Sequence, residues 1–148
     1  MCQELHPRAI HHEELAQEIL KDYPVLYSKM HRNCKIPEEF VSTGLREVIR
    51  FMNLIAFKNE VLTPSRVVDD LWHEFILFTR LYGAFCQDYF GRMIHHQPGG
   101  TEKQNLKQYK RTLDLYKEYF DSPDPLYWGY WAGVMDNAQC GTCESPKS

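Results

Sequence analysis

The side chains best suited to chemistry are concentrated between residues 69 and 96. Five of them are candidate metal ligands: Asp69, His73, Cys86, His95 and His96. Neutral imidazole and thiolate suit Zn²⁺ and other borderline transition metals, and a carboxylate can fill a remaining position. This stretch therefore predicts a metal site for zinc or another transition metal, and the identity of the cofactor stays open.

Asp69 and His73 lie four positions apart, which places them on one face of a helix. Both could point at one ion, or the carboxylate could orient the imidazole. The alternative interpretation gives His73 a structural role. A histidine that follows Trp72 on a buried helix can donate a hydrogen bond to a backbone carbonyl or to Asp69 and bind no metal.

The distance between His73 and Cys86 decides whether both can bind the same metal ion. On one straight helix, His73 and Cys86 would lie about 20 Å apart and point about 140° away from each other. A break near Thr79, with that residue as the N-cap of a second helix from Arg80, would let His73 approach the His95–His96 pair. The predicted cluster therefore depends on a bend close to Thr79.

Cys140 and Cys143 form a C-x-x-C motif near the end of the chain. As half of a zinc site it lacks two further ligands, and as a redox motif it lacks a βαβ setting. The third reading is a pair of thiols in a flexible tail over residues 137–148. The chain has five widely spaced cysteines, which indicates thiols or metal ligands and no disulfide framework.

Catalytic motifs are not found in the sequence. No hydrolase-like triad and no glycine-rich phosphate loop is present, and His73-Glu74 begins an H-E-x-x-H motif that fails at Leu77. Whether the chain is an enzyme is left open.

Composition narrows the class of protein. The chain has 148 residues, 43% of them hydrophobic and 14% aromatic, with a net charge of −3. This fits one folded domain and argues against binding of nucleic acid through its phosphates. No run approaches 18 apolar residues, and the N-terminus lacks the apolar core of a signal peptide. We therefore expect a cytoplasmic protein that does not bind membranes.

Hydrophobic spacing predicts helices throughout the chain. Helices are expected over residues 11–22, 25–32, 38–58, 64–91 and 101–120. Thr63 and Pro64 form a helix start, Gly91 a helix end, and Tyr23-Pro24 a kink. His11 and His12 are expected to be exposed at a helix start.

Period-2 alternation is not found, so the predicted fold is all-α. We expect a compact single-domain bundle of about five to six helices over residues 1–136. The helical stretch 64–91 is apolar on nearly every side and is expected at its centre. The aromatic segment 126–134 is expected to close an open end of the core.

Residues 69–98 carry a resemblance to a known family. Asp69, Trp72-His73, Ile76-Leu77, Tyr82, Cys86, Phe90-Gly91 and His95-His96 resemble the glycine-rich domain-containing protein-like family, over about residues 36–120. Plant members often have Pro at the position of Thr79, so the resemblance implies a helix break there. It implies no particular reaction, and the long glycine-rich tail of some members is absent here.

Three functions are compatible with these observations. The first is a cytoplasmic binding or interaction domain, with or without a bound metal, whose partner is an unknown protein or small molecule. The second is a metal-dependent enzyme that uses His73 in a pocket lined by Trp72 and Tyr82. The third is a structural protein–protein adaptor with an exposed aromatic surface at residues 127–131.

Overall fold

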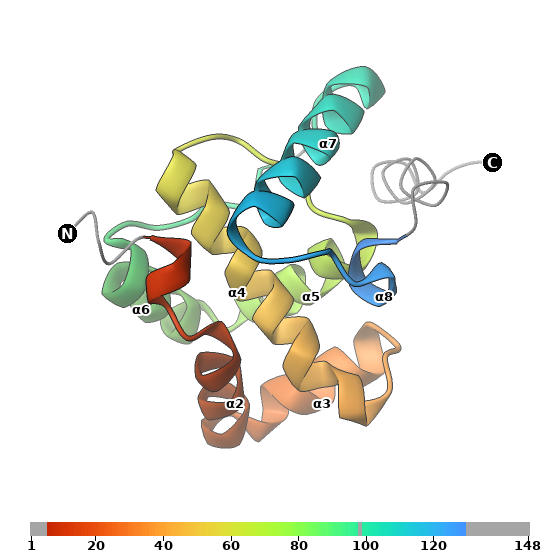
Figure 1. The fold of residues 1–148 in the computed structure, drawn as a ribbon. Helices are drawn as coiled ribbons and strands as arrows, with labels where there is room; N and C mark the ends of the chain where they lie inside the picture. Colours follow the sequence, from red (N-terminus) through yellow and green to blue (C-terminus); the bar gives the residue numbers. More distant parts are fainter. Residues whose placement is uncertain (1–5, 98, 130–148) are drawn as a thin grey trace.

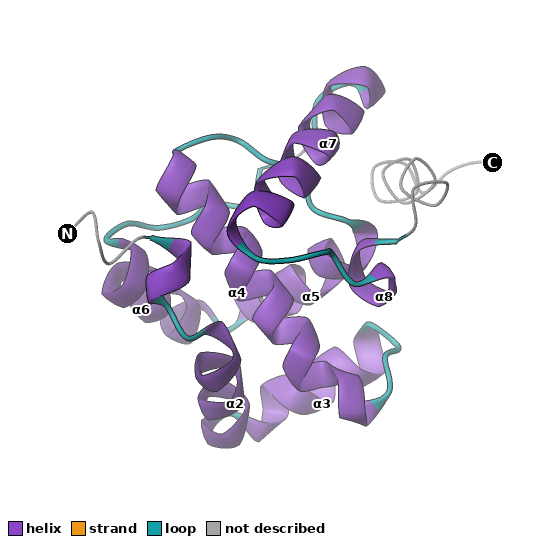
Figure 2. Ribbon diagram, in the orientation of Figure 1, coloured by secondary structure: helices purple, strands orange, loops and turns teal. Residues whose placement is uncertain are grey.

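The structure, a computed structural model, describes residues 6–97 and 99–129 of the chain. Over these residues it contains seven α-helices, two short 3-10 helices and no strand (Figures 1 and 2). The elements are η1 (Pro7–Ala9), α2 (His12–Asp22), α3 (Pro24–Asn33), η2 (Glu38–Phe40), α4 (Val41–Lys58), α5 (Arg66–Leu77), α6 (Thr79–Phe90), α7 (Glu102–Tyr119) and α8 (Pro125–Trp128). Six of them have ten residues or more, which confirms the predicted all-α bundle.

Helix α4 lies at the centre of the bundle and contacts α2, α3, α5 and α7 (Figure 1). Eleven of its 18 residues are buried, because apolar side chains recur on several of its faces. Gly44 lets α5 approach closely, since a Cβ atom at this position would lie 2.8 Å from the Leu71 side chain. The expectation that residues 64–91 lie at the centre holds for α5, which contacts α3, α4, α6 and α8, but not for one continuous helix over the whole stretch.

The chain breaks between α5 and α6 at Phe78, whose ψ angle of 71° is not helical. Aromatic contacts hold α6 against α5, with the Phe75 ring 5.1 Å from that of Tyr82 and 5.6 Å from that of Phe85. The predicted bend near Thr79 is confirmed. Thr79 itself is the first residue of α6, and the N-cap residue Phe78 makes no side-chain cap.

The helix ends that border the later loops have identifiable caps. Ser65, and not Thr63, caps α5, because its hydroxyl accepts a hydrogen bond from the Val68 amide at 3.1 Å. Gly91 ends α6 in the left-handed conformation with a φ of 73°, as predicted. Thr101 begins α7 in a capping box with Gln104.

Helix α8 closes one end of the core through two aromatic side chains that are almost fully buried, Tyr127 and Trp128. The Tyr127 hydroxyl donates to the Phe40 carbonyl at 2.9 Å. Both side chains are therefore unavailable for the exposed surface that the adaptor hypothesis requires. The remainder of that segment from residue 130, the Cys140–Cys143 motif and the predicted tail lie outside the described residues.

One buried histidine corrects the sequence-based expectation. His12 is 6% exposed, and its Nε2 lies 2.9 Å from Oδ1 of Asn53 on α4, whereas His11 is exposed. The first turn of α2 therefore packs against α4 instead of facing solvent.

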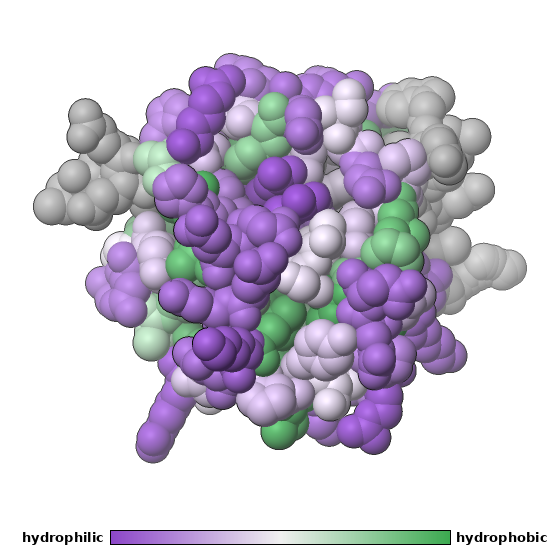
Figure 3. Space-filling model, turned by 60° about the horizontal axis from the view of Figure 1, so that its bottom comes forward, coloured by the Kyte–Doolittle hydropathy of each residue, from purple (hydrophilic) through white to green (hydrophobic). Residues whose placement is uncertain are grey.

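The surface is mixed in character. On the face drawn in Figure 3, hydrophobic side chains occur in small areas separated by polar ones. Among the described helices, none is long and apolar enough to span a membrane.

Candidate ligand-binding site

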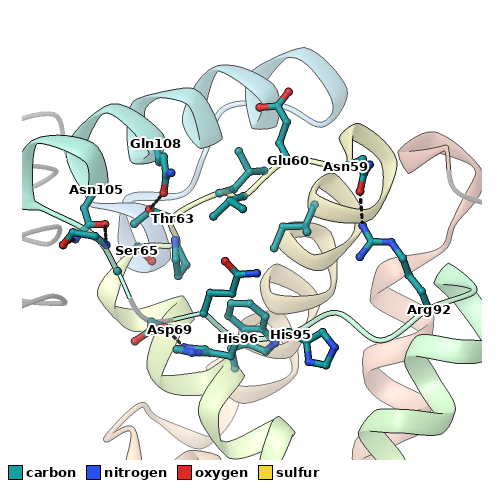
Figure 4. A pocket seen from close by; sticks show the side chains of 18 residues that line it. Asn59, Glu60, Thr63, Ser65, Asp69, Arg92, His95, His96, Asn105 and Gln108 are labelled. Atoms are coloured by element: carbon teal, nitrogen blue, oxygen red, sulfur yellow. Dashed lines mark hydrogen bonds and ion pairs between the residues drawn. The ribbon is translucent and has the colours of Figure 1, made fainter.

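A cavity of about 480 Å³ opens where four segments of the chain meet (Figure 4). Its walls come from residues 59–65 after α4, the first turns of α5, the loop after α6 and the first turns of α7. The walls come from two stretches of the chain that are separated in sequence, residues 55–72 and residues 92–108. The fold assembles the cavity by bringing the α4–α5 loop and the α6–α7 loop together.

A carboxylate–imidazole pair lies in the cavity wall. Nε2 of His96 is 2.7 Å from Oδ1 of Asp69, and each side chain is about a quarter exposed. The His96 ring also packs on Trp72 at 4.7 Å and meets the edge of His73 at 4.6 Å between ring centroids. Three neighbours on α5 therefore hold the His96 side chain in place.

This geometry changes the pairing expected from the sequence. Asp69 is hydrogen-bonded to His96, 27 positions away, and not to His73, which is exposed. The structure brings Asp69, His73 and His96 together, and His95 lines the same cavity. No spacing in the sequence pairs Asp69 with His96, because the contact depends on how the chain turns after α6.

Cys86 belongs to a different environment, the buried side of α6. Its thiol neighbours Tyr82, whose hydroxyl accepts from Trp72 Nε1 at 2.9 Å and donates to the Ile94 carbonyl. Burial raises the pKa of the Cys86 thiol. Because metals bind thiolate, this burial disfavours a ligand role.

The candidate metal ligands are therefore only partly brought together. Within residues 6–97 and 99–129, no group of three or more His, Cys, Asp or Glu side chains is arranged to hold a metal ion. The zinc or transition-metal site stays a prediction. Of the predicted ligands, Asp69 and His96 lie within hydrogen-bond distance of each other.

Four polar contacts in the cavity region were not anticipated from the sequence. The Arg92 guanidinium donates to Oδ1 of Asn59 at 3.2 Å, and the Thr63 hydroxyl donates to Oε1 of Gln108 at 2.9 Å. Asn105 accepts a hydrogen bond from the Gly100 amide at 3.1 Å. Most of these residues lie in loops or at helix ends, where hydrophobic periodicity gives no signal.

The fourth contact, at the cavity rim, is an ion pair between Glu60 and Arg111. Two guanidinium nitrogens of Arg111 donate to the carboxylate at 2.9 and 3.1 Å. This hydrogen bonding lowers the pKa of the Glu60 carboxyl, so the ion pair stays charged near neutral pH. The pair also ties α7 to the loop that follows α4.

Comparison with known proteins identifies the family of the chain. Searches of curated proteins and of solved structures gave no match. The sequence model of the UCP032817-like family matches residues 4–118. The resemblance to the glycine-rich domain-containing protein-like family is therefore wrong. Several residues that suggested it, such as Trp72, Tyr82 and Phe90, are buried packing positions, so their spacing reflects the helical core. Because the match covers most of its length, the chain belongs to the UCP032817-like family.

Proposed function

We propose that this chain is a binding domain that holds a small polar organic molecule in the cavity beside Asp69 and His96. The observation that carries this proposal is the convergence of four chain segments on one cavity of about 480 Å³. Pockets for small molecules typically measure about 300–1,000 Å³. The cavity is therefore large enough for a metabolite-sized ligand.

The lining supports a polar ligand. Amide side chains of Asn59, Gln97, Asn105 and Gln108 provide donors and acceptors, and Trp72 provides an aromatic wall. The hydrogen bonds within the lining hold several of these groups in place before a ligand binds. Such preorganisation lowers the entropic cost of binding.

The enzyme hypothesis has less support. It requires a pocket beside His73 lined by Trp72 and Tyr82, but Tyr82 is 4% exposed and its hydroxyl is engaged with Trp72 and Ile94. The proposed ligand is organic because the described donors form no group suited to a metal ion. The cytoplasmic location and the single domain over residues 1–136 remain part of the proposal.

A cavity-blocking variant tests this function. Val61 lines the cavity and is 54% exposed, so Val61→Trp should fill the entrance with little effect on the core. Val25, on α3, is 58% exposed and lies outside the lining, so Val25→Trp is a matched control. The purified protein is screened by ligand-observed NMR against amino acids, sugars, nucleosides and small carboxylic and phosphoric esters.

The expected result is at least one compound that binds the wild-type protein and the Val25→Trp variant but not Val61→Trp. Hits that bind all three proteins equally would place binding elsewhere. A screen without any hit in these classes would also overturn the proposal.

A further inference from the structure

The charges in the cavity wall indicate the class of ligand, and this inference rests on the proposed function. Five titratable side chains line the cavity: Glu60, Asp69, Arg92, His95 and His96. The pairing among these side chains determines whether the cavity favours a cationic or an anionic ligand.

Both carboxylates in the lining have partners. Asp69 is hydrogen-bonded to His96, and Glu60 forms a two-pronged ion pair with Arg111. A carboxylate that is already paired attracts a ligand cation weakly, because a ligand would have to displace the existing partner. Each lining carboxylate is therefore already engaged by at least one hydrogen-bond donor.

Arg92 is in a different position. One of its terminal nitrogens donates to the Asn59 side chain at 3.2 Å, and that partner is a neutral amide (Figure 4). No ion pair joins Arg92 to a carboxylate within the described part of the chain. A guanidinium stays protonated at all ordinary pH values. Arg92 thus contributes to the cavity wall a positive charge whose hydrogen-bond partner is a neutral amide.

We infer that the ligand carries an anionic group, a carboxylate or a phosphate, that binds at Arg92. The guanidinium has further N–H donors beyond the one used by Asn59, and its planar fork matches paired oxygens of either anion. His95, three positions along, lines the same cavity and provides a second polar group there.

Two pairs of probes test this inference by changing charge at nearly constant shape. Malonate is compared with malonamide, and glycerol phosphate with glycerol, by titration of ¹⁵N-labelled protein followed in ¹H–¹⁵N NMR spectra. At least one anion should shift the signals of cavity residues and bind at least tenfold tighter than its neutral counterpart. Tighter binding of malonate would indicate a carboxylate ligand, and tighter binding of glycerol phosphate a phosphate ligand.

Three variants locate the binding at Arg92. Arg92→Gln should weaken the anion by about 10- to 100-fold, the range expected for loss of a charged hydrogen bond. Arg92→Lys keeps the charge without the planar fork and should fall between Arg92→Gln and the wild type. Arg80→Gln removes an exposed guanidinium outside the lining, at the start of α6, and should leave affinity unchanged.

The results separate this inference from the proposed function. Equal binding of an anion and its neutral counterpart, or full affinity in Arg92→Gln, would overturn the anion inference while the cavity remains a binding site. Absence of cavity shifts with all four probes would also overturn it. The screen with Val61→Trp then decides the proposed function independently.

Discussion

Nε2 of His96 lies 2.7 Å from Oδ1 of Asp69, although the two residues are 27 positions apart. Asp69 is in the first turn of α5, and His96 is in the loop between α6 and α7. The described residues of this loop, 91–97 and 99–101, form no helix or strand, so side-chain contacts must fix its path. The Asp69–His96 pair is the hydrogen bond among the contacts that hold the loop against α5 at the cavity.

The energy of this contact can be measured by a double-mutant cycle with Asp69→Ala and His96→Ala. Because both side chains are about a quarter exposed, we expect a coupling of about 0.5–1 kcal/mol in the free energy of unfolding. Urea denaturation measures it. The matched control combines Asp69→Ala with His95→Ala, for which no coupling is expected. Additive effects in both cycles would show that the loop is held by other contacts.

Much of the fold was predictable because it follows from local sequence. The kink at Tyr23-Pro24, the break near Thr79 and the end of α6 at Gly91 depend on backbone preferences of a few neighbouring residues. The start of α5 was misplaced by two residues, from Thr63 to Ser65. Either side chain can cap a helix. The Ser65 hydroxyl also donates to the Tyr127 carbonyl, 62 positions away, and neighbouring residues in the sequence do not predict that contact.

The site was harder to predict because it is made of long-range contacts. His95 and His96 were predicted as site residues because imidazole is a common metal ligand. The sequence contains no pattern that separates Arg92, Asn59 and Gln108 from ordinary surface residues. Their roles arise only when the loops around the cavity are placed. His12 was misassigned for the same reason, since its partner Asn53 is 41 positions away.

Glu47 provides a second prediction because it is a fully buried carboxylate at the centre of α4. Its Oε1 accepts from the Tyr116 hydroxyl at 2.5 Å and from Trp128 Nε1 at 2.8 Å, and its Oε2 pairs with Arg46 at 2.8 Å. Burial, followed by the charge of Glu47, raises the pKa of the Tyr116 hydroxyl, which stays a neutral donor. One side chain thus joins α4, α7 and α8.

Glu47→Ala should lower the free energy of unfolding by about 3–5 kcal/mol, because it leaves buried donors and a cation unpaired. Glu47→Gln keeps an acceptor but loses the charge, and we expect a smaller loss of about 1–3 kcal/mol. Chemical denaturation followed by tryptophan fluorescence measures both. Glu39→Gln, at an exposed position, is the control and should be neutral. A loss below 1 kcal/mol for Glu47→Ala would contradict this role.

His12 predicts a dependence of stability on pH. Burial, the largest cause, and the nearby positive charges of Arg50 and Arg46 lower the pKa of His12 from 6.5 to about 4, although its hydrogen bond with Asn53 acts in the opposite direction. Between these values the unfolded chain binds a proton that the folded protein does not. The contribution of His12 is therefore complete above pH 6.5 and decreases as the pH falls toward 4, by up to about 3 kcal/mol.

Other groups also titrate in this range, so the measurement is a comparison of variants. His12→Gln should show a flatter decrease in stability between pH 6.5 and 4 than His11→Gln, which changes the exposed neighbour. Urea denaturation at a series of pH values gives both profiles. Parallel profiles, or an NMR titration that places the His12 pKa near 6.5, would refute the prediction.

Two glycines of the α6 region should respond to alanine with opposite signs. Gly91 ends the helix with a φ of 73° and directs the chain toward Arg92, and a Cβ atom there would have no neighbour within 4 Å. Gly91→Ala should therefore cost about 1–2 kcal/mol through backbone strain alone, and Gly91→Asn less. Gly83 lies inside α6, where an added Cβ would make an ordinary contact at 3.5 Å with Met93, so Gly83→Ala should stabilise by about 0.5–1 kcal/mol. Thermal and urea denaturation measure both, and changes of the same sign would contradict the explanation by backbone conformation.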